Sequence, residues 1–170
     1  CLDVFWGILM RLLAAFFYTL FLQIGWELKV NKKNLSSLKK SAIILLDQFS
    51  RNLFRNNKKA FSMDNKCRQI STKALGQGYH KILAEDQIMF IFLPFMHSEK
   101  LSDQIYCGNL INTYFKNHPS YEEAKKFATL HENIIREFKR FPYRNKVLGR
   151  KSTKKEKEYL NSTHHDFFNI

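Results

Sequence analysis

Glycine and proline are scarce in this chain, with six and three residues among 170. That scarcity excludes collagen-like repeats and flexible Gly/Pro-rich linkers, and it favours long helices joined by short turns. Hydrophobic residues make up 45% of the chain and aromatic residues 15%, which is too apolar for a disordered protein. A chain of this length buries roughly 70% of the surface that it exposes when unfolded, so we expect one domain with its own core.

Cysteine pairs with the spacing of metal or redox motifs are missing too. Cys1, Cys67 and Cys107 lie far apart, so the sequence predicts neither a disulfide framework nor a zinc site. No Gly-rich phosphate loop follows a strand, and we expect no cofactor. Unpaired thiols fit the reducing cytoplasm, which is the expected location. Because the chain opens on Cys1, upstream residues missing from it and a processed, lipidated end both stay open.

Acidic residues are outnumbered, 15 against 28 basic ones, for a formal charge of +13. A clustered basic face would bind nucleic acid by replacing the counterions of its phosphates. Here the lysines are scattered, the densest basic run is 144–157, and no known binding motif is present. We therefore do not expect a nucleic-acid partner.

Residues 4–26 form the longest apolar stretch, and they are numerous enough to span a bilayer. Arg11 and Gln23 interrupt the stretch, and an arginine well inside a span costs about 2.5–3.5 kcal/mol on insertion scales. Two interpretations stay open: a buried first helix, or an inner-membrane anchor. With an anchor, the lysines from Lys29 to Lys40 would keep the remainder in the cytoplasm.

Apolar residues recur at helical spacing along the rest of the chain, without the alternation of strands. The pattern predicts helices over about 36–51, 61–75, 84–93, 98–115, 120–140 and 153–160. Gly76 and Gly78 suit a left-handed C-cap, and Pro94 disfavours helical backbone at Leu93. Ser120–Glu123 and Thr153–Glu156 have the pattern of a capping box.

The predicted fold is all-α: antiparallel helical hairpins in a bundle of about six or seven helices. We divide the chain into an apolar N-terminal helix (1–30), a helical domain (31–161) and a frayed tail (162–170).

Three segments combine aromatic or proline residues with charged and amide side chains: 47–52, 93–99 and 140–145. Each follows a run that is predicted to be a buried helix. Polar groups beside apolar anchors must find partners, so the three segments are candidates for one shared polar site.

The first of these segments lies within Ile-Ile-Leu-Leu-Asp-Gln-Phe-Ser-Arg-Asn (43–52), which resembles the signature of a bacterial family known as domain of unknown function 924. Residues 92–99 with Gln104, and the region from His131 through 140–145 to 148–153, strengthen the resemblance in order and approximate spacing. It covers about residues 41–160. The resemblance implies a fold similar to tetratricopeptide-type helical hairpins, and the family has no established activity.

The chain departs from the family pattern at several positions. Ser50 stands where proline is usual, Lys139 where glycine is common, and Tyr143 where histidine is usual. Tyr143 argues against a mechanism that needs an imidazole at that position. The first 30 residues match poorly beyond the aromatic opening at 2–7, which leaves a degraded, truncated or repurposed N-terminus as alternatives.

The favoured functional hypothesis is a module that binds a small anion or a peptide carboxylate, since guanidinium groups suit both. Arg51, Arg140 and Arg144 would form the clamp, and the remaining residues would orient or line it: Asp47, Asn52, Asn145, His97 and Glu99.

Three alternatives remain beside it. Asp47 and Arg51 are four apart on a helix and could form a purely structural pair. A hydrolase could use His97 or His131 as its base, with Glu99 as a further catalytic candidate. A helical scaffold that binds proteins would need no pocket at all.

Overall fold

The computed structural model of the chain describes residues 39–162. The apolar stretch 4–26, most of the predicted N-terminal region and residues 163–170 lie outside that part. Between residues 39 and 162, no helix is long and apolar enough to cross a membrane. The anchor, the domain limits and the location in the cell stay predictions.

The described part is all-α, without a strand, which confirms the predicted class and the expected number of helices. A first helical rod runs from residue 39 through a wide π-helical turn, Leu45–Phe49, into α3 (Ser50–Leu53). The other helices are α4 (Asp64–Gly76), α5 (Glu85–Met96), α6 (Leu101–Tyr114), α7 (Tyr121–Phe138) and α8 (Lys154–Asn161). Three 3-10 turns join them: η2 (Lys58–Phe61), η3 (Tyr79–Lys81) and η4 (Pro142–Arg144).

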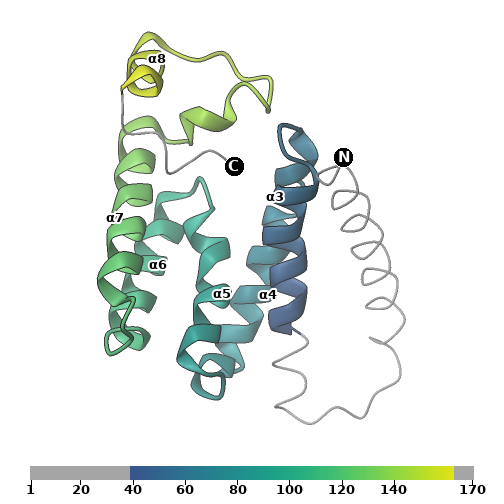
Figure 1. Cartoon of the computed structure of the whole chain (residues 1–170), viewed down its shortest axis with the longest axis vertical. Coiled ribbons are helices and arrows are strands. Elements are labelled where there is room, and N and C mark those ends of the chain that lie inside the picture. The colour runs from purple at the N-terminus through teal and green to yellow at the C-terminus, as the bar shows by residue number, and fades with distance from the viewer. Residues whose placement is uncertain (1–38, 163–170) are drawn as a thin grey trace, which may run out of the picture.

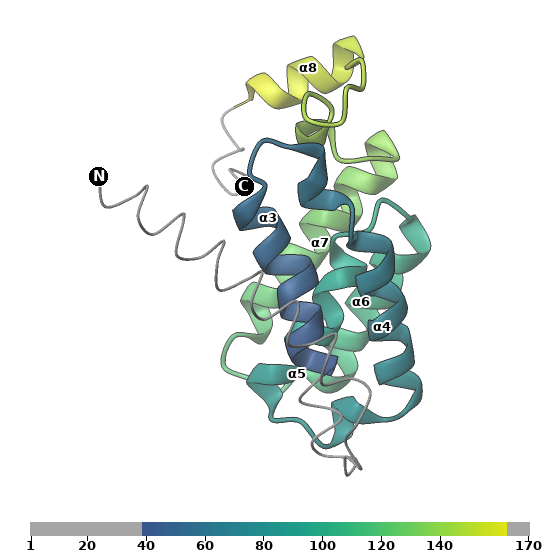
Figure 2. The same cartoon turned by 90° about the vertical axis from the view of Figure 1, so that its right-hand side faces the viewer.

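Consecutive helices pack on one another. Helix α6 lies between α5 and α7, α4 lies against α5, and the π turn contacts α4. Figures 1 and 2 show η4 and α8 at one end of the bundle, the end where α3 finishes. The core includes Ile43, Ile91, Phe92 and Ile111, each at most 1% exposed. Full burial of such a side chain stabilises the fold by roughly 1.5–3 kcal/mol.

Helix α5 continues through Pro94 to Met96, beyond the end that the sequence predicts. Proline lacks the N–H of a helical hydrogen bond, so its interior position costs stability. Phe95 and Met96 are each 3% exposed, and their burial holds the last turn in place. Gln104 from α6 donates to the carbonyls of Met96 and Ser98, which satisfies acceptors just where α5 ends.

The two predicted capping boxes have different outcomes. At α8, Thr153 accepts from the backbone of Glu156 and the Glu156 carboxylate accepts from the backbone of Thr153. At α7, the Ser120 side chain makes no capping bond, and the prediction was wrong. Ser120 has φ −90° and ψ 17°, whereas a capping residue needs the extended backbone that Thr153 has, with φ −70° and ψ 167°.

Four residues of the described part have left-handed backbone, Asn56, Gly78, Lys139 and Gly149, and two of them end helices. Gly78 follows α4 with φ 73°, as the sequence predicts, whereas Gly76 lies inside α4 and the prediction for it was wrong. Lys139 ends α7 with φ 61°, at the position where the family resemblance implies glycine. A lysine there is strained by its Cβ, so the turn into Phe141 is maintained by other contacts.

Candidate functional site

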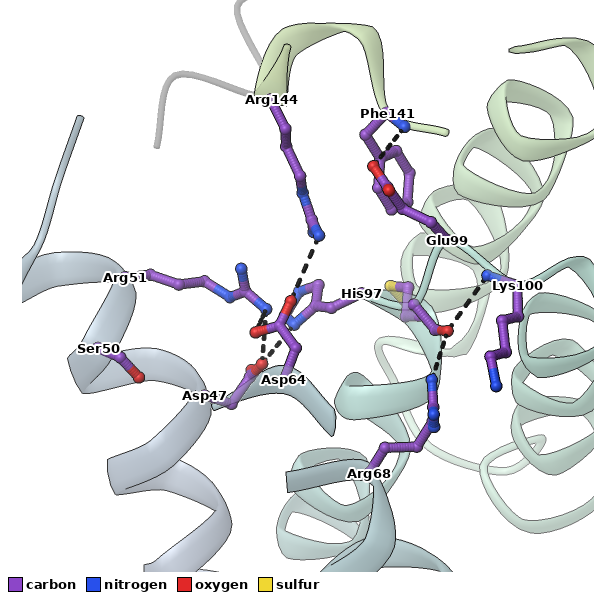
Figure 3. A network of polar contacts seen from close by, with 12 residues as sticks. Asp47, Ser50, Arg51, Asp64, Arg68, His97, Glu99, Lys100, Phe141 and Arg144 are labelled. Atoms are coloured by element: carbon purple, nitrogen blue, oxygen red, sulfur yellow. Dashed lines mark hydrogen bonds and ion pairs between the residues drawn. The ribbon is translucent and has the colours of Figure 1, made fainter. Parts of the chain in front are cut away.

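Asp47 lies at the centre of a buried polar network, which Figure 3 shows. The π turn at Leu45–Phe49 directs its side chain into the protein, where the residue is 1% exposed. One carboxylate oxygen, Oδ1, accepts from Arg51 Nη2 at 2.9 Å and from His97 Nδ1 at 2.8 Å. Arg51 comes from α3 and His97 from the end of α5, so Asp47 ties the first helical rod to the middle of the bundle.

Asp64 at the start of α4 joins a second arginine to this network. Its Oδ1 accepts from Arg51 Nη2 at 2.9 Å, and its Oδ2 accepts from Arg144 Nη1 at 3.3 Å. Arg144 lies in η4, 80 positions further along the chain. The network therefore brings segments 47–52, 93–99 and 140–145 together at one place.

Aromatic rings enclose the Arg144 guanidinium. Its central carbon lies 4.6 Å from the ring centroids of both Phe61 and Phe141, and 5.7 Å from that of Tyr143. Arg51 also lies over Phe61, at 5.4 Å. Stacking of this kind stabilises a guanidinium while it leaves the N–H groups at its edge available for an acceptor.

Both arginines keep hydrogen-bond donors without a partner. Arg51 and Arg144 are 3% and 4% exposed. Nε and Nη1 of Arg51, and Nε and Nη2 of Arg144, are buried and make no hydrogen bond within the described residues, 39–162. A buried polar group left unsatisfied costs about 1–3 kcal/mol, and more when it is charged. The network thus contains more donors than residues 39–162 supply acceptors for.

The carboxylate of Asp47 remains ionised. Burial opposes its charge, but the charge that His97 carries once protonated in acid, the charge of Arg51 and the hydrogen bonds from both residues outweigh burial and hold the pKa of Asp47 far below its usual range. The same carboxylate and Asp64 raise the pKa of Arg51 against the effect of burial. At neutral pH the network contains two carboxylates and two guanidiniums, which balance in charge.

Two imidazoles face this cluster, with ring centroids 6.4 Å apart. Burial lowers the pKa of His97, and Arg51 and Arg144 lower it further although Asp47 raises it. Burial likewise lowers the pKa of His131 to about 4. Each Nδ1 lies 2.8 Å from an oxygen that only accepts: Asp47 Oδ1 for His97 and the Phe127 carbonyl for His131. Nδ1 therefore carries the proton in both neutral rings, and Nε2 is the basic nitrogen.

The model of the family described as "Bacterial protein of unknown function (DUF924)" matches residues 20–164. The chain belongs to this family. A solved structure of a protein of unknown function from Agrobacterium tumefaciens is similar to it, with 32% identity and a TM-score of 0.67. That similarity covers 74% of this chain and 68% of the other. No curated protein matches.

Three of the predicted site residues of this DUF924 chain have partners outside the central network. Glu99 accepts from Arg150 at 2.7 and 3.0 Å and from the backbone of Phe141 at 2.8 Å. Arg140 is bound to Glu156 and to a carbonyl, at 2.6–3.0 Å. Asn145 donates to Ser152 at 3.1 Å. These contacts hold the turn after α7 and the start of α8.

The fourth outlying residue, Asn52, is solvent-exposed on α3. The structure thus unites Asp47, Arg51, His97, Arg144 and His131, and it places Glu99, Arg140, Asn145 and Asn52 around or outside them.

Sequence reasoning missed Asp64 and Phe61, which contact both arginines of the network. In the sequence, Asp64 stands out only as an acidic residue in the first turn of a helix, where the helix dipole stabilises a negative charge. Nothing in the local pattern relates it to Arg144, since only the closure of the bundle brings the two together.

Metal and thiol chemistry find little support in the part of the chain from 39 to 162. No group of three or more His, Cys, Asp or Glu side chains there could hold a metal ion. Cys67 and Cys107 are buried thiols, and burial raises the pKa of both, that of Cys107 to about 12. Neither would form a reactive thiolate at neutral pH.

Two hollows lie away from the network. One of about 260 Å³ lies between α6 and α7, beside Gly108, Lys125 and Glu132. The other, of about 300 Å³, is lined mainly by apolar residues, among them Met89 and Phe127. Neither contains a residue of the network.

Proposed function

We propose that this chain binds a small oxyanion, a phosphate or a carboxylate, between Arg51 and Arg144. The observation that carries the proposal is the set of four buried guanidinium nitrogens on these two side chains that have no partner in the described part of the chain. An oxyanion supplies only acceptors, and hydrogen bonds between charged groups are roughly twice as strong as neutral ones. Binding would recover the cost of burying those donors unsatisfied.

The ligand set of this proposal is narrower than the one that the sequence predicts. Arg51 and Arg144 are the clamp, Asp47 and Asp64 orient them, and His97 lies beside them. Arg140, Glu99 and Asn145 act indirectly, because they hold the turn that carries Arg144.

Entry of the ligand requires a small movement. Phe61 covers both arginines, and it ends a turn whose preceding residues, 54–59, are exposed. Exposed turns with few buried contacts open at low cost compared with core helices. We propose that this turn moves aside to admit the anion.

The test compares Arg144→Lys with the wild type in titrations with phosphate and acetate, at an ionic strength held constant with NaCl. Lysine keeps the charge and loses the planar fork of donors, so we expect affinity to fall at least tenfold. An anion concentration of about 100 times the dissociation constant should raise the free energy of unfolding of the wild type by about 2.7 kcal/mol. That corresponds to a rise of roughly 5–10 °C in Tm. Arg136→Lys, at an exposed pair with Glu132 on α7, is the matched control.

An unchanged anion affinity in Arg144→Lys, or a wild type that responds to NaCl as it does to phosphate, would show that the network is a structural clamp. Circular dichroism of each variant establishes that the helices are intact.

A second candidate function, a hydrolase, is favoured by the hydrogen bond between His97 and Asp47. A carboxylate on Nδ1 orients an imidazole whose Nε2 can take a proton from water, as a general base does. His131, the other candidate base, donates to a carbonyl instead. Turnover of p-nitrophenyl phosphate or p-nitrophenyl acetate that is lost in His97→Gln would establish the activity. A wild type that binds anions and turns over neither ester is a binding module.

A further inference from the structure

We infer that the anion is a phosphoryl group, and that His97 takes up a proton as the group binds, so that two guanidiniums and one imidazolium hold it. This inference rests on the proposed function, because it concerns the ligand between Arg51 and Arg144. Beyond that function, it specifies the chemical class of the ligand and the protonation of His97 on binding.

The number and position of the free donors favour a tetrahedral group. Arg51 and Arg144 come from separate elements, α3 and η4, and each keeps two unpartnered donor atoms. Nε and Nη2 of Arg144 form one edge of its guanidinium and can bind both oxygens of a carboxylate, which leaves Arg51 unsatisfied. A phosphoryl group has three terminal oxygens pointing in different directions, so both arginines can bind it at once.

The charges around His97 explain why it would gain a proton. Arg51 and Arg144 disfavour the imidazolium, and Asp47 favours it. His131 faces it from α7, and Asp64 accepts from both arginines. In the free protein the two carboxylates and two guanidiniums balance, and the imidazole stays neutral. A bound dianion offsets the positive field of the arginines, and its own charge favours a proton on the nearest base.

His97 is better placed than His131 to receive that proton. Nδ1 of His97 donates to a carboxylate, whereas Nδ1 of His131 donates to a neutral carbonyl. An imidazolium with a carboxylate on one nitrogen and a phosphoryl oxygen on the other is paired on both sides. His131 would have a negative partner on one side at most.

With a phosphoryl group bound, His97 would carry a proton on Nε2 and could donate it to an oxygen of the ligand. It would not act as a base in that complex.

Sulfate is the probe for the proton, because it is a tetrahedral dianion that does not titrate near neutral pH. Calorimetric titrations of the full chain with sulfate, in two buffers of different ionisation enthalpy at one pH, give the number of protons exchanged. We expect uptake approaching one proton per sulfate and an affinity that falls up to about tenfold per pH unit from pH 6.5 to 8. His97→Gln should abolish the uptake and weaken sulfate about tenfold without abolishing binding. His118→Gln, at a ring stacked on Phe115, is the matched control.

Parallel titrations with acetate, phosphate and phenyl phosphate define the class. Acetate should bind at least tenfold more weakly than sulfate and phosphate. Tighter binding of phenyl phosphate identifies the phosphoryl group of a larger molecule, and equal or weaker binding identifies free phosphate; both support the inference.

The possible failures are distinguishable. Acetate that binds as tightly as sulfate overturns the phosphoryl class, and sulfate binding without proton uptake by the wild type overturns the role of His97. In both cases the proposed anion site survives. A wild type that binds none of the four anions overturns the proposed function itself.

Discussion

Asp64 shows how a single residue can determine the geometry of this site. Each of its oxygens accepts from a different arginine, Arg51 at 2.9 Å and Arg144 at 3.3 Å. Those two bonds use one nitrogen of each guanidinium, Nη2 of Arg51 and Nη1 of Arg144, and in the described part of the chain the other two nitrogens of each have no partner. The same contacts that neutralise the arginines therefore position their free edges.

His131 supplies a prediction at the scale of one residue. Burial lowers its pKa to about 4, against about 6.5 in an unfolded chain. Between those values the unfolded state binds the proton first, so the contribution of His131 to stability is intact above pH 6.5 and is lost as the pH falls to 4. The wild type should lose free energy of unfolding between pH 7 and pH 4. In His131→Gln that loss should be smaller by on the order of 2–3 kcal/mol.

Urea unfolding at pH 7 and pH 4 measures this difference. His97, whose pKa is also lowered, should retain its own share of the acid sensitivity. An equal pH dependence in His131→Gln and the wild type would mean that His131 is hydrated rather than buried. The corresponding change at His118 is the control.

Single elements explain why some local patterns predict structure and others do not. Thr153–Glu156 and Ser120–Glu123 share one capping pattern, and only the first forms the bonds. Donor and acceptor types were readable from sequence in both cases, whereas the backbone angles of Ser120 follow from the turn that joins α6 to α7. Pro94 is a second example. Proline disfavours helical backbone at the residue before it, but burial of Phe95 and Met96 overrides that preference.

The end of α7 supplies the prediction at the scale of an element. Lys139 has φ 61°, where a Cβ costs roughly 1–2 kcal/mol relative to right-handed backbone. Glycine avoids that cost but loses more entropy on folding, so Lys139→Gly should stabilise the protein by about 0.5–1 kcal/mol. Lys126→Gly, at an exposed position inside α7, should instead destabilise it by roughly 1 kcal/mol. Both values come from urea unfolding, and a Lys139→Gly variant no more stable than Lys126→Gly would contradict this account.

At the scale of the whole molecule, arginine and lysine have different roles. Six arginines in the described part pair with carboxylates, among them Arg144 and Arg150 of the basic run 144–157. The lysines of that run are all exposed, and two of them, Lys154 and Lys155, form surface ion pairs. The high net charge therefore lies at the surface, where it opposes aggregation, while the arginines hold the tertiary structure.

Glu99 supplies the prediction at this scale. It fixes the segment after α7 through Arg150, 51 positions away, and through the backbone of Phe141. Glu99→Gln keeps the shape and removes the charge, and a hydrogen bond to a charged group contributes about 1.5–3 kcal/mol. Hydrogen exchange should accelerate in residues 139–153 while α5 and α6 keep their protection. Glu132→Gln, which breaks a surface pair with Arg136, should leave hydrogen exchange unchanged both in residues 139–153 and in α5 and α6.

The sequence alone determined the class of fold, because helical periodicity, few breakers and the signature blocks all depend on neighbouring residues. It also identified Asp47, Arg51, His97 and Arg144 as residues to watch, since charged groups beside aromatic anchors need partners. The tertiary structure alone decided which of the three polar segments supply partners to one another. Asp64 reaches Arg144 across 80 positions, while Arg140 and Glu99 turn to Glu156 and Arg150. Such pairings depend on how the helices pack over one another. No local sequence pattern indicates which residues so far apart along the chain will meet.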